Sequence, residues 1–148
     1  MVREKEDLTN DRRCGFSIIT ARDIDLIGAK GVIDALKERV GNNKVYISLD
    51  IDSLDPAFAP GMSSWNLAIP SIFRYVLTQT ATGTSEPGGW STREMLTILD
   101  GLTGLQVVGA DVVEVAPIYD NPGESTVLAA AEIVQSLLTL MVHTPIDS

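Results

Sequence analysis

The sequence of 148 residues has very little of the side chains that build zinc sites and disulfides. Cys14 is its only cysteine and His143 its only histidine. One cysteine excludes an internal disulfide, and one cysteine with one histidine excludes a Cys/His zinc cluster made by this chain alone. The composition is compatible with a reducing compartment, and a cytoplasmic location is the default expectation.

Basic residues are scarce relative to acidic ones. Eleven Lys and Arg stand against twenty Asp and Glu, which gives a net charge of −9. This excess of negative charge argues against a nucleic-acid partner, because the phosphate backbone is itself anionic. It permits a cationic substrate or metal ions, and it is equally typical of a well-solvated acidic surface.

Long apolar runs are also missing. No window approaches the roughly 18 uninterrupted apolar residues of a membrane span, and residues 1–13, MVREKEDLTNDRR, lack the apolar centre of a signal peptide. We therefore expect no membrane partner. The length and the apolar fraction of 45% suit one domain with a real core.

Helical and strand patterns alternate along the chain. Residues 21–40, 91–101 and 125–142 have helical spacing, and the form Ser91-Thr-Arg-Glu94 predicts a capping box. Residues 44–49 and 105–116 read as strands buried on both faces, and 14–20 as a short β-rich run. For the last helix, the predicted apolar face consists of Val127, Leu128, Ala131, Val134, Leu138 and Met141. This alternation predicts an α/β fold with a mainly parallel sheet.

Acidic residues follow both predicted strands. Asp50 and Asp52 come after the first strand, and Asp111 and Glu114 lie late in the second. Residues two apart in an extended segment point the same way, so Asp50 and Asp52 would present two carboxylates to one hard cation such as Mn²⁺, Mg²⁺ or Ca²⁺. The alternative is that Asp50 and Asp55 cap a turn and Asp52 is solvated. An unrelated module that binds a single Mg²⁺ also fits this spacing.

Three motifs favour the metal site over these alternatives: SLDIDSLDPAFAP from Ser48, TGTSEPGGWSTREML from Thr82 and VVGADVVEVAP from Val107. In this order, over about residues 11–141, the sequence resembles the ureohydrolase family of arginases and agmatinases, and it is closer to the agmatinases. The resemblance implies a three-layer α-β-α fold with a mainly parallel sheet. It also implies hydrolysis of a linear guanidino compound, agmatine favoured, to urea and an amine, as in polyamine metabolism.

The resemblance also implies roles for individual residues. Asp50 and Asp52 match ligands of a pair of Mn²⁺ ions, which activate a hydroxide that attacks the guanidinium carbon. Glu114 matches the glutamate that binds the cationic guanidinium by charge-assisted hydrogen bonds. The alternative for Glu114 is a buried strand residue paired with a nearby Arg or Lys. We interpret Asp55 as a turn-stabilising residue and Asp111 as a structural residue or a support for the ligands.

The sequence departs from the family pattern at its start. Family members carry an N-terminal half with a Gly-Gly-Asp-His-like motif and a DAHxD-like motif, and neither is present here. Two octahedral ions offer on the order of twelve coordination positions, which two aspartates do not fill. We expect residues 1–148 to be the C-terminal part of a single ureohydrolase domain, incomplete at its N-terminal side and inactive by itself. His143 follows the last helix, and we expect it to be solvent-exposed and not a ligand.

The second departure is internal. The family runs directly from DPAFAP into ATGT, whereas residues 61–80 intervene here, and deleting them joins Pro60 to Ala81 and restores the pattern. Our hypothesis is a retained intron translated in frame, since codons for Gly-Met-Ser and Thr-Ala can contain splice-site-like strings. The competing interpretation is a genuine inserted element with an amphipathic helix after Pro70.

The expected partners follow from the resemblance. They are a small guanidino substrate and either a second copy of the chain or a full-length homologue. The alternative function is therefore a non-catalytic truncated homologue that associates with intact ureohydrolase subunits. Any of several guanidino compounds would suit Glu114, so the sequence does not identify the substrate.

Overall fold

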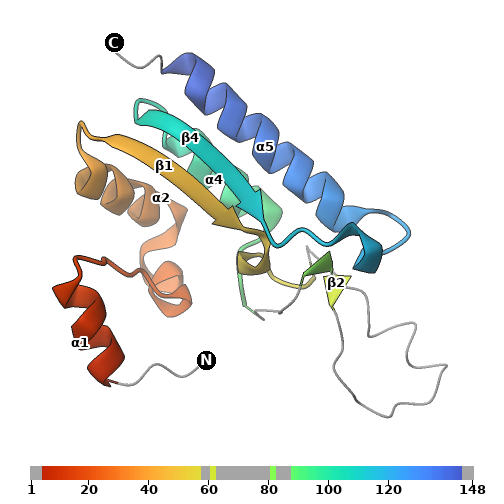
Figure 1. Cartoon of the computed structure of the whole chain (residues 1–148), viewed down its shortest axis with the longest axis horizontal. Coiled ribbons are helices and arrows are strands. Elements are labelled where there is room, and N and C mark those ends of the chain that lie inside the picture. The colour runs from red at the N-terminus through yellow and green to blue at the C-terminus, as the bar shows by residue number, and fades with distance from the viewer. Residues whose placement is uncertain (1–4, 58–60, 63–80, 83–87, 145–148) are drawn as a thin grey trace.

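The computed structural model describes residues 5–57, 61–62, 81–82 and 88–144. The elements are α1 (Lys5–Arg13), α2 (Ala21–Val40), β1 (Lys44–Asp50), the 3-10 turn η1 (Ile51–Ser53), β2 (Gly61–Met62), β3 (Ala81–Thr82), α4 (Thr92–Gly101), β4 (Gln106–Val113), the 3-10 turn η2 (Pro117–Tyr119) and α5 (Ser125–His143). The predicted helices and strands from residue 21 onward are present and alternate as α2, β1, α4, β4 and α5, whereas α1, β2 and β3 were not predicted (Figure 1).

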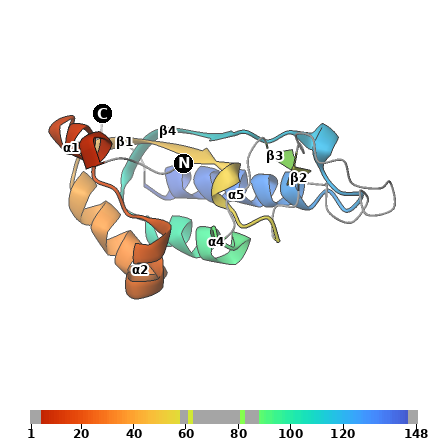
Figure 2. The same ribbon diagram turned by 90° about the horizontal axis from the view of Figure 1, so that it is seen from below.

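Strands β1 and β4 form a parallel pair. The register runs from Lys44 opposite Gln106 to Asp50 opposite Val113, with an irregularity between Val45 and Tyr46. Figure 2 shows α2, α4 and α5 on one side of this pair. The α/β class with a parallel sheet is confirmed. The prediction that both strands are buried on both faces is wrong, because residues of β1 alternate between exposed and more buried positions and the described helices cover one face.

Two of the predicted helix starts, those of α4 and α2, are confirmed by their caps. The Glu94 amide donates to Ser91 Oγ at 3.2 Å, and the Ser91 amide donates to a Glu94 carboxylate oxygen at 2.9 Å. These two bonds satisfy amides that an uncapped helix leaves without partners. The hydrogen bonds from Ser91 also lower the pKa of Glu94. A second capping box, formed by Thr20 and Asp23, starts α2.

The core lies between the sheet and the helices on its covered face. Ile51 and Ile133 have no exposed surface, and Val107 is 1% exposed. On α5 the buried residues are Thr126, Ala129, Ala130, Ile133, Leu137 and Leu140. The face that the sequence predicted for this helix is therefore wrong, since Leu128, Ala131, Val134 and Leu138 are exposed. Apolar residues occur on both sides of α5, so periodicity alone did not identify the side that packs.

The β-rich run Cys14–Thr20 does not form a strand. Residues 16–20 belong to no helix or strand, and Phe16 and Ile18 are exposed. A strand needs a neighbouring strand to satisfy its backbone N–H and C=O groups, and the described residues place no strand beside this segment. Strand-forming composition is therefore not sufficient here.

Candidate functional site

The carboxyl ends of β1 and β4 meet at one edge of the sheet. Asp50 is the last residue of β1 and lies opposite Val113, the last residue of β4, so Glu114 follows directly beside it. In Figure 1 both arrowheads lie at the same end of the pair. The parallel pairing thus brings these two acidic positions together from sequence positions 64 residues apart (114 − 50).

Asp52 is placed differently from its prediction. It lies in η1, not in an extended segment, and Asp50 Oδ1 accepts a hydrogen bond from the Asp52 amide at 2.9 Å. The carboxylate of Asp50 therefore caps the turn, because a short Asp side chain reaches the amide two residues on. The two aspartates do not have the alternating geometry of a strand, and Asp52 is half-buried.

Asp55 stabilises the loop that follows. Its Oδ1 accepts from the Ala57 amide at 2.8 Å and its Oδ2 from the Gly88 amide at 2.7 Å. These two backbone hydrogen bonds hold the pKa of Asp55 below its usual value. The hydrogen bond from the Ala57 amide lowers the pKa most, followed by that from the Gly88 amide. The contacts agree with its interpretation as a turn-stabilising residue.

The second half of the loop is held by a close backbone contact. The Asp55 amide donates to the Trp90 carbonyl and the Trp90 amide to the Ser53 carbonyl, both at 2.9 Å. A Cβ at Gly89 would lie 2.5 Å from the Ser53 carbonyl oxygen. Only glycine lets the two backbones approach this closely. The Gly88-Gly89 pair in the sequence indicates a close approach of two backbones, but it does not show which segment lies against Gly89.

The ends of the predicted 61–80 insertion lie side by side. Gly61 pairs with Ala81 and Met62 with Thr82 in the short parallel strands β2 and β3. Residues 63–80 lie outside the described residues. Because the two ends meet, an insertion between them is compatible with the contact between Ser53–Asp55 and Gly88–Trp90. Its origin as an intron or as a genuine element stays a prediction.

Glu114 has an unusual backbone. Its φ is 62°, in the left-handed region, and its side chain is exposed. The alternative that Glu114 is a buried strand residue is wrong. A non-glycine residue in this region costs roughly 1–3 kcal/mol, and such strain gathers at functional positions. The strain therefore agrees with a functional role for the carboxylate.

Asp111 is joined to β1 across the open face of the sheet. Tyr46 donates its hydroxyl to Asp111 Oδ2 at 2.8 Å, and Ser48 donates its hydroxyl to Oδ1 at 2.7 Å. The hydrogen bond from Ser48, followed by that from Tyr46, lowers the pKa of Asp111, and the bond to Asp111 raises the pKa of Tyr46. Sequence reasoning missed this cluster because its partners are 63 and 65 residues apart.

The described residues supply only part of a metal site. Asp50 and Asp52 offer the oxygen donors that Mn²⁺ accepts. Within residues 5–57, 61–62, 81–82 and 88–144, however, no group of three or more His, Cys, Asp or Glu residues is placed to hold an ion. His143 lies at the far end of the sheet, since the next residue, Thr144, accepts from the Gly104 amide just before β4. This chain's carboxylates fit a manganese site without completing one.

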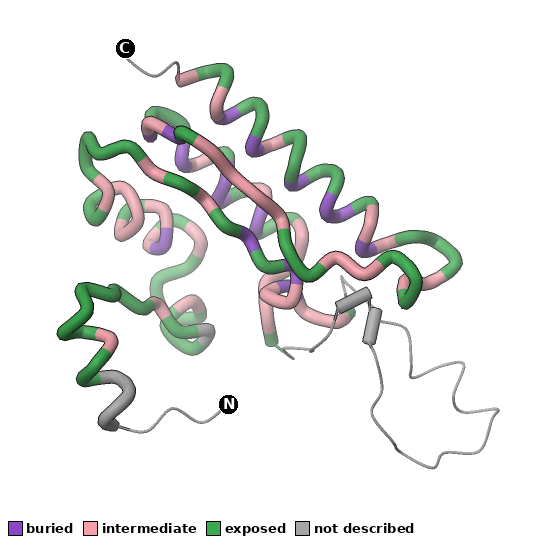
Figure 3. The backbone as a smooth tube through the Cα atoms, viewed as in Figure 1, coloured by how far each residue is buried: buried purple, intermediate pink, exposed green. Residues whose placement is uncertain are grey.

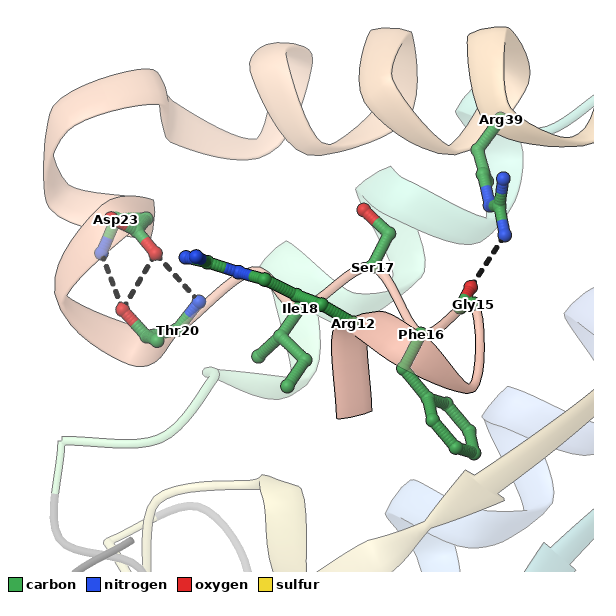
Figure 4. A pocket seen from close by; sticks show the side chains of 8 residues that line it. All are labelled: Arg12, Gly15, Phe16, Ser17, Ile18, Thr20, Asp23 and Arg39. Carbon is green, nitrogen blue, oxygen red and sulfur yellow. Dashed lines mark hydrogen bonds between the residues drawn. The ribbon is translucent and has the colours of Figure 1, made fainter. Parts of the chain in front are cut away.

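A cavity of about 650 Å³ lies elsewhere, between the α1–α2 connection and α2. Figure 4 shows Arg39 donating to the Gly15 carbonyl, at 2.6 Å, and the capping box of Thr20 and Asp23 at its wall. None of the acidic residues at the strand ends lines it. The candidate site is therefore the open edge and not this cavity.

Comparison with known proteins agrees with these motifs. The sequence matches the arginase family over residues 2–67 and 77–139. The chain belongs to the arginase family. Among curated members of this family, "Putative agmatinase 1" of Schizosaccharomyces pombe is 48% identical over 140 residues, which are 95% of this chain and 30% of that protein. The chain thus spans about a third of the length of such relatives.

Solved structures of the arginase family have the same fold. Proclavaminate amidinohydrolase of Streptomyces clavuligerus superposes with a TM-score of 0.74 at 36% identity, over 93% of this chain and 39% of that one. A hypothetical agmatinase of Burkholderia thailandensis gives a TM-score of 0.70 at 37% identity, over 88% and 35%. The arginase-like fold and the agmatinase-like family are therefore shown, and roughly three fifths of each solved chain has no counterpart here.

Proposed function

We propose that this chain provides one part of the active site of a manganese-dependent, agmatinase-like ureohydrolase. The substrate of the complete enzyme is a linear guanidino compound, agmatine favoured, and the products are urea and an amine. The observation that carries this proposal is that Asp50 and Asp52 at the end of β1 and Glu114 at the end of β4 lie at one sheet edge in an arginase-family chain.

In this proposal the acidic residues fill three different roles. Asp50 and Asp52 bind manganese, which supplies an activated water when it is bound. Glu114 accepts hydrogen bonds from the guanidinium and holds the substrate carbon over the edge. Asp55 and Gly89 hold the loop in place, so they affect the reaction by positioning Asp52.

We further propose that the chain by itself hydrolyses no guanidino compound. Two aspartates leave most coordination positions of two ions to other ligands, and the described residues bring no histidine to this edge. The second candidate function is association of this chain, as a non-catalytic subunit, with an intact homologue. The uncovered sheet face and the coverage of about a third of its relatives favour that function.

A chimera tests the proposal. The N-terminal portion of the S. pombe relative is joined to this chain, with and without residues 61–80, and urea release is measured with agmatine, arginine and guanidinobutyrate. We expect the chimera without residues 61–80 to release urea, Asp50→Asn and Asp52→Asn to abolish it, and Glu114→Gln to raise KM. Asp100→Asn, an exposed carboxylate on α4, is the matched control and should leave activity unchanged. A chimera equally active without Asp50 and Asp52 would refute the proposal.

A further inference from the structure

Two side chains of β1 share one carboxylate of β4 on the open face of the sheet. Tyr46 donates its hydroxyl to Asp111 Oδ2 at 2.8 Å, and Ser48 donates its hydroxyl to Asp111 Oδ1 at 2.7 Å. We call these three residues the strand clamp. Figure 3 shows mostly exposed and half-buried positions along the two strands that it joins. The clamp forms entirely within the described residues of this chain.

Tyr46 is also held against the backbone of β4. It pairs with Gly109, and a Cβ at Gly109 would lie 2.9 Å from Tyr46 Cε2 and 3.0 Å from Tyr46 Cδ2. Because glycine has no Cβ, the tyrosine ring lies in space that the side chain of any other residue would fill. The ring therefore contacts β4 at Gly109, and its hydroxyl contacts the same strand two residues further along, at Asp111.

The two hydrogen bonds of the strand clamp resist sliding of one strand along the other. Ser48 lies directly opposite Asp111, whereas Tyr46 reaches it diagonally. Residues two apart on a strand are separated by about 6.6 Å, since each residue rises about 3.3 Å. One bond between the strands would allow a small slide, but two bonds from separated points to one carboxylate would both lengthen or bend. The clamp therefore fixes the position of β4 along β1.

The candidate site comes directly after the strand clamp. Asp50 lies opposite Val113, and Glu114 follows. On the proposed function, the metal-binding carboxylate therefore belongs to β1 and the guanidinium-binding carboxylate follows β4. The position of one strand along the other thus sets the distance between these two carboxylates. A misplacement of about 1 Å can lower the rate of a reaction roughly a hundredfold.

We propose that Tyr46 is a positioning residue, which through the strand clamp fixes the distance between Asp50 and Glu114. The catalytic consequence rests on the proposed function, whereas the clamp is a property of the chain itself. Because Asp50 and Asp52 both come from the end of β1, they move together when the strands slide. Loosening the clamp should therefore leave metal binding intact and lower kcat.

The competing interpretation is a strand clamp that only stabilises the fold. A matched loss of one hydroxyl hydrogen bond distinguishes the two interpretations. Thr103 donates its hydroxyl to the Asp100 carbonyl at 2.8 Å, just before β4 at the opposite end of the sheet. Thr103→Ala removes a bond of the same kind, far from the acidic edge. If every such bond acts only through stability, Thr103→Ala and Tyr46→Phe should have the same effects.

Amide hydrogen exchange of this chain, followed by nuclear magnetic resonance, tests the clamp without metal or substrate. Tyr46→Phe keeps the ring and removes the hydroxyl bond, and Gly109→Ala displaces the ring. Both should accelerate exchange at the site end of the strands, residues 48–50 and 111–113, by about threefold or more relative to the buried residues of α5. Thr103→Ala should leave this ratio unchanged.

Kinetics of the chimera without residues 61–80 test the positioning role. With agmatine, Tyr46→Phe should lower kcat by about fivefold or more and change KM by less than about twofold. Bound Mn²⁺, counted after equilibrium dialysis, should not change. Adding Tyr46→Phe to Asp111→Asn should lower kcat no further, because both remove the same hydrogen bond. Thr103→Ala should leave kcat, KM and bound metal as they are.

Different results overturn different parts of the account. Exchange that Tyr46→Phe leaves unchanged would overturn the strand clamp, whether or not the chimera is active. In an active chimera, an unchanged kcat in Tyr46→Phe, or a loss of Mn²⁺ in step with kcat, would overturn the positioning role. A chimera that binds no Mn²⁺ and releases no urea would refute the proposed function instead, and the exchange result would then decide on the clamp alone.

Discussion

The two faces of the β1–β4 pair differ in what they contribute. Leu49 and Val107 point into the covered face, where α4 and α5 bury them. Tyr46, Ser48 and Asp111 lie on the open face and are joined by hydrogen bonds. Apolar burial on the first face provides most of the stability. The polar side chains on the open face continue along the strands to the acidic edge. The stabilising core and the polar side chains that lead to the candidate site therefore lie on opposite faces of one pair of strands.

The largest expected effect comes from the covered face. Ile133→Ala removes a side chain with no exposed surface and should lower the free energy of unfolding by about 2–5 kcal/mol. Leu138→Ala, at a 58% exposed leucine on the opposite side of the same helix, should change it by less than about 0.5 kcal/mol. Urea unfolding of both variants checks the difference. Equal losses would mean that both sides of α5 are packed, which would contradict the burial of Ile133 and the exposure of Leu138.

The next effect concerns the loop that carries Asp52. Gly89→Ala places a methyl group against the backbone of Ser53 and Asp55 and should cost about 1–3 kcal/mol. At Gly123 the nearest contact of an added Cβ is the end of the Asn121 side chain, so Gly123→Ala should cost less. Thermal denaturation compares the two variants, and a smaller loss at position 89 would show that the loop is not held by this contact.

The third effect is a gain in stability at the expense of function. Glu114→Gly relieves the left-handed backbone and should stabilise the fold by up to about 1 kcal/mol. Glu124→Gly is a matched control, because Glu124 has a φ of 53° and forms no side-chain cap bond. Urea unfolding should show a similar gain for both. Only Glu114→Gly should abolish urea release by the chimera. If both variants lost activity equally, the result would contradict a specific role for Glu114 in the site.

The smallest effect is the pH dependence of the open face. The pKa of Asp111 is lower in the folded chain than its unfolded value near 3.8, so its contribution is present above that pH and is lost as the pH falls through the folded pKa. The pKa of Tyr46 is raised above 10.0, so its contribution is present below pH 10 and is lost as the pH rises through the folded pKa. Both effects are small, since these exposed groups are screened by water.

The variant Asp111→Asn tests this coupling. It removes the carboxylate that raises the pKa of Tyr46, so the pKa of that tyrosine should fall. Ultraviolet titration of the tyrosines measures the shift, with Tyr46→Phe identifying the signal that belongs to Tyr46. An unchanged titration in Asp111→Asn would show that the hydrogen bond does not form in solution.

Local sequence signals predicted most of the fold. The Ser91–Glu94 capping box, the end of α2 at Gly41 and the strand at Lys44 depend on neighbouring residues, and all three were predicted from the sequence. The buried side of α5 was not, because it depends on which apolar stripe meets the sheet. Likewise, the Tyr46–Asp111 contact depends on strand register, which a single sequence does not encode locally.

The candidate site was likewise predictable from the sequence only in part. The sequence predicted a mainly parallel sheet with acidic residues after both strands, and from this it follows that Asp50 and Glu114 lie at one edge. The turn at Asp52 was predicted only as the alternative in which Asp50 caps a turn. The Asp50 side chain forms this turn because it accepts a hydrogen bond from the Asp52 amide, in competition with continued strand pairing. The strained backbone of Glu114 likewise has no signature in its own residue type.

Manganese binding by the chimera tests the central claim most directly. Equilibrium dialysis followed by metal analysis counts the bound ions per chain, independently of catalysis. The account predicts two Mn²⁺ per chain in the chimera, a loss of bound metal in Asp50→Asn and Asp52→Asn, and full retention in Asp100→Asn. A double variant, Asp50→Asn with Asp52→Asn, that still holds both ions would contradict it.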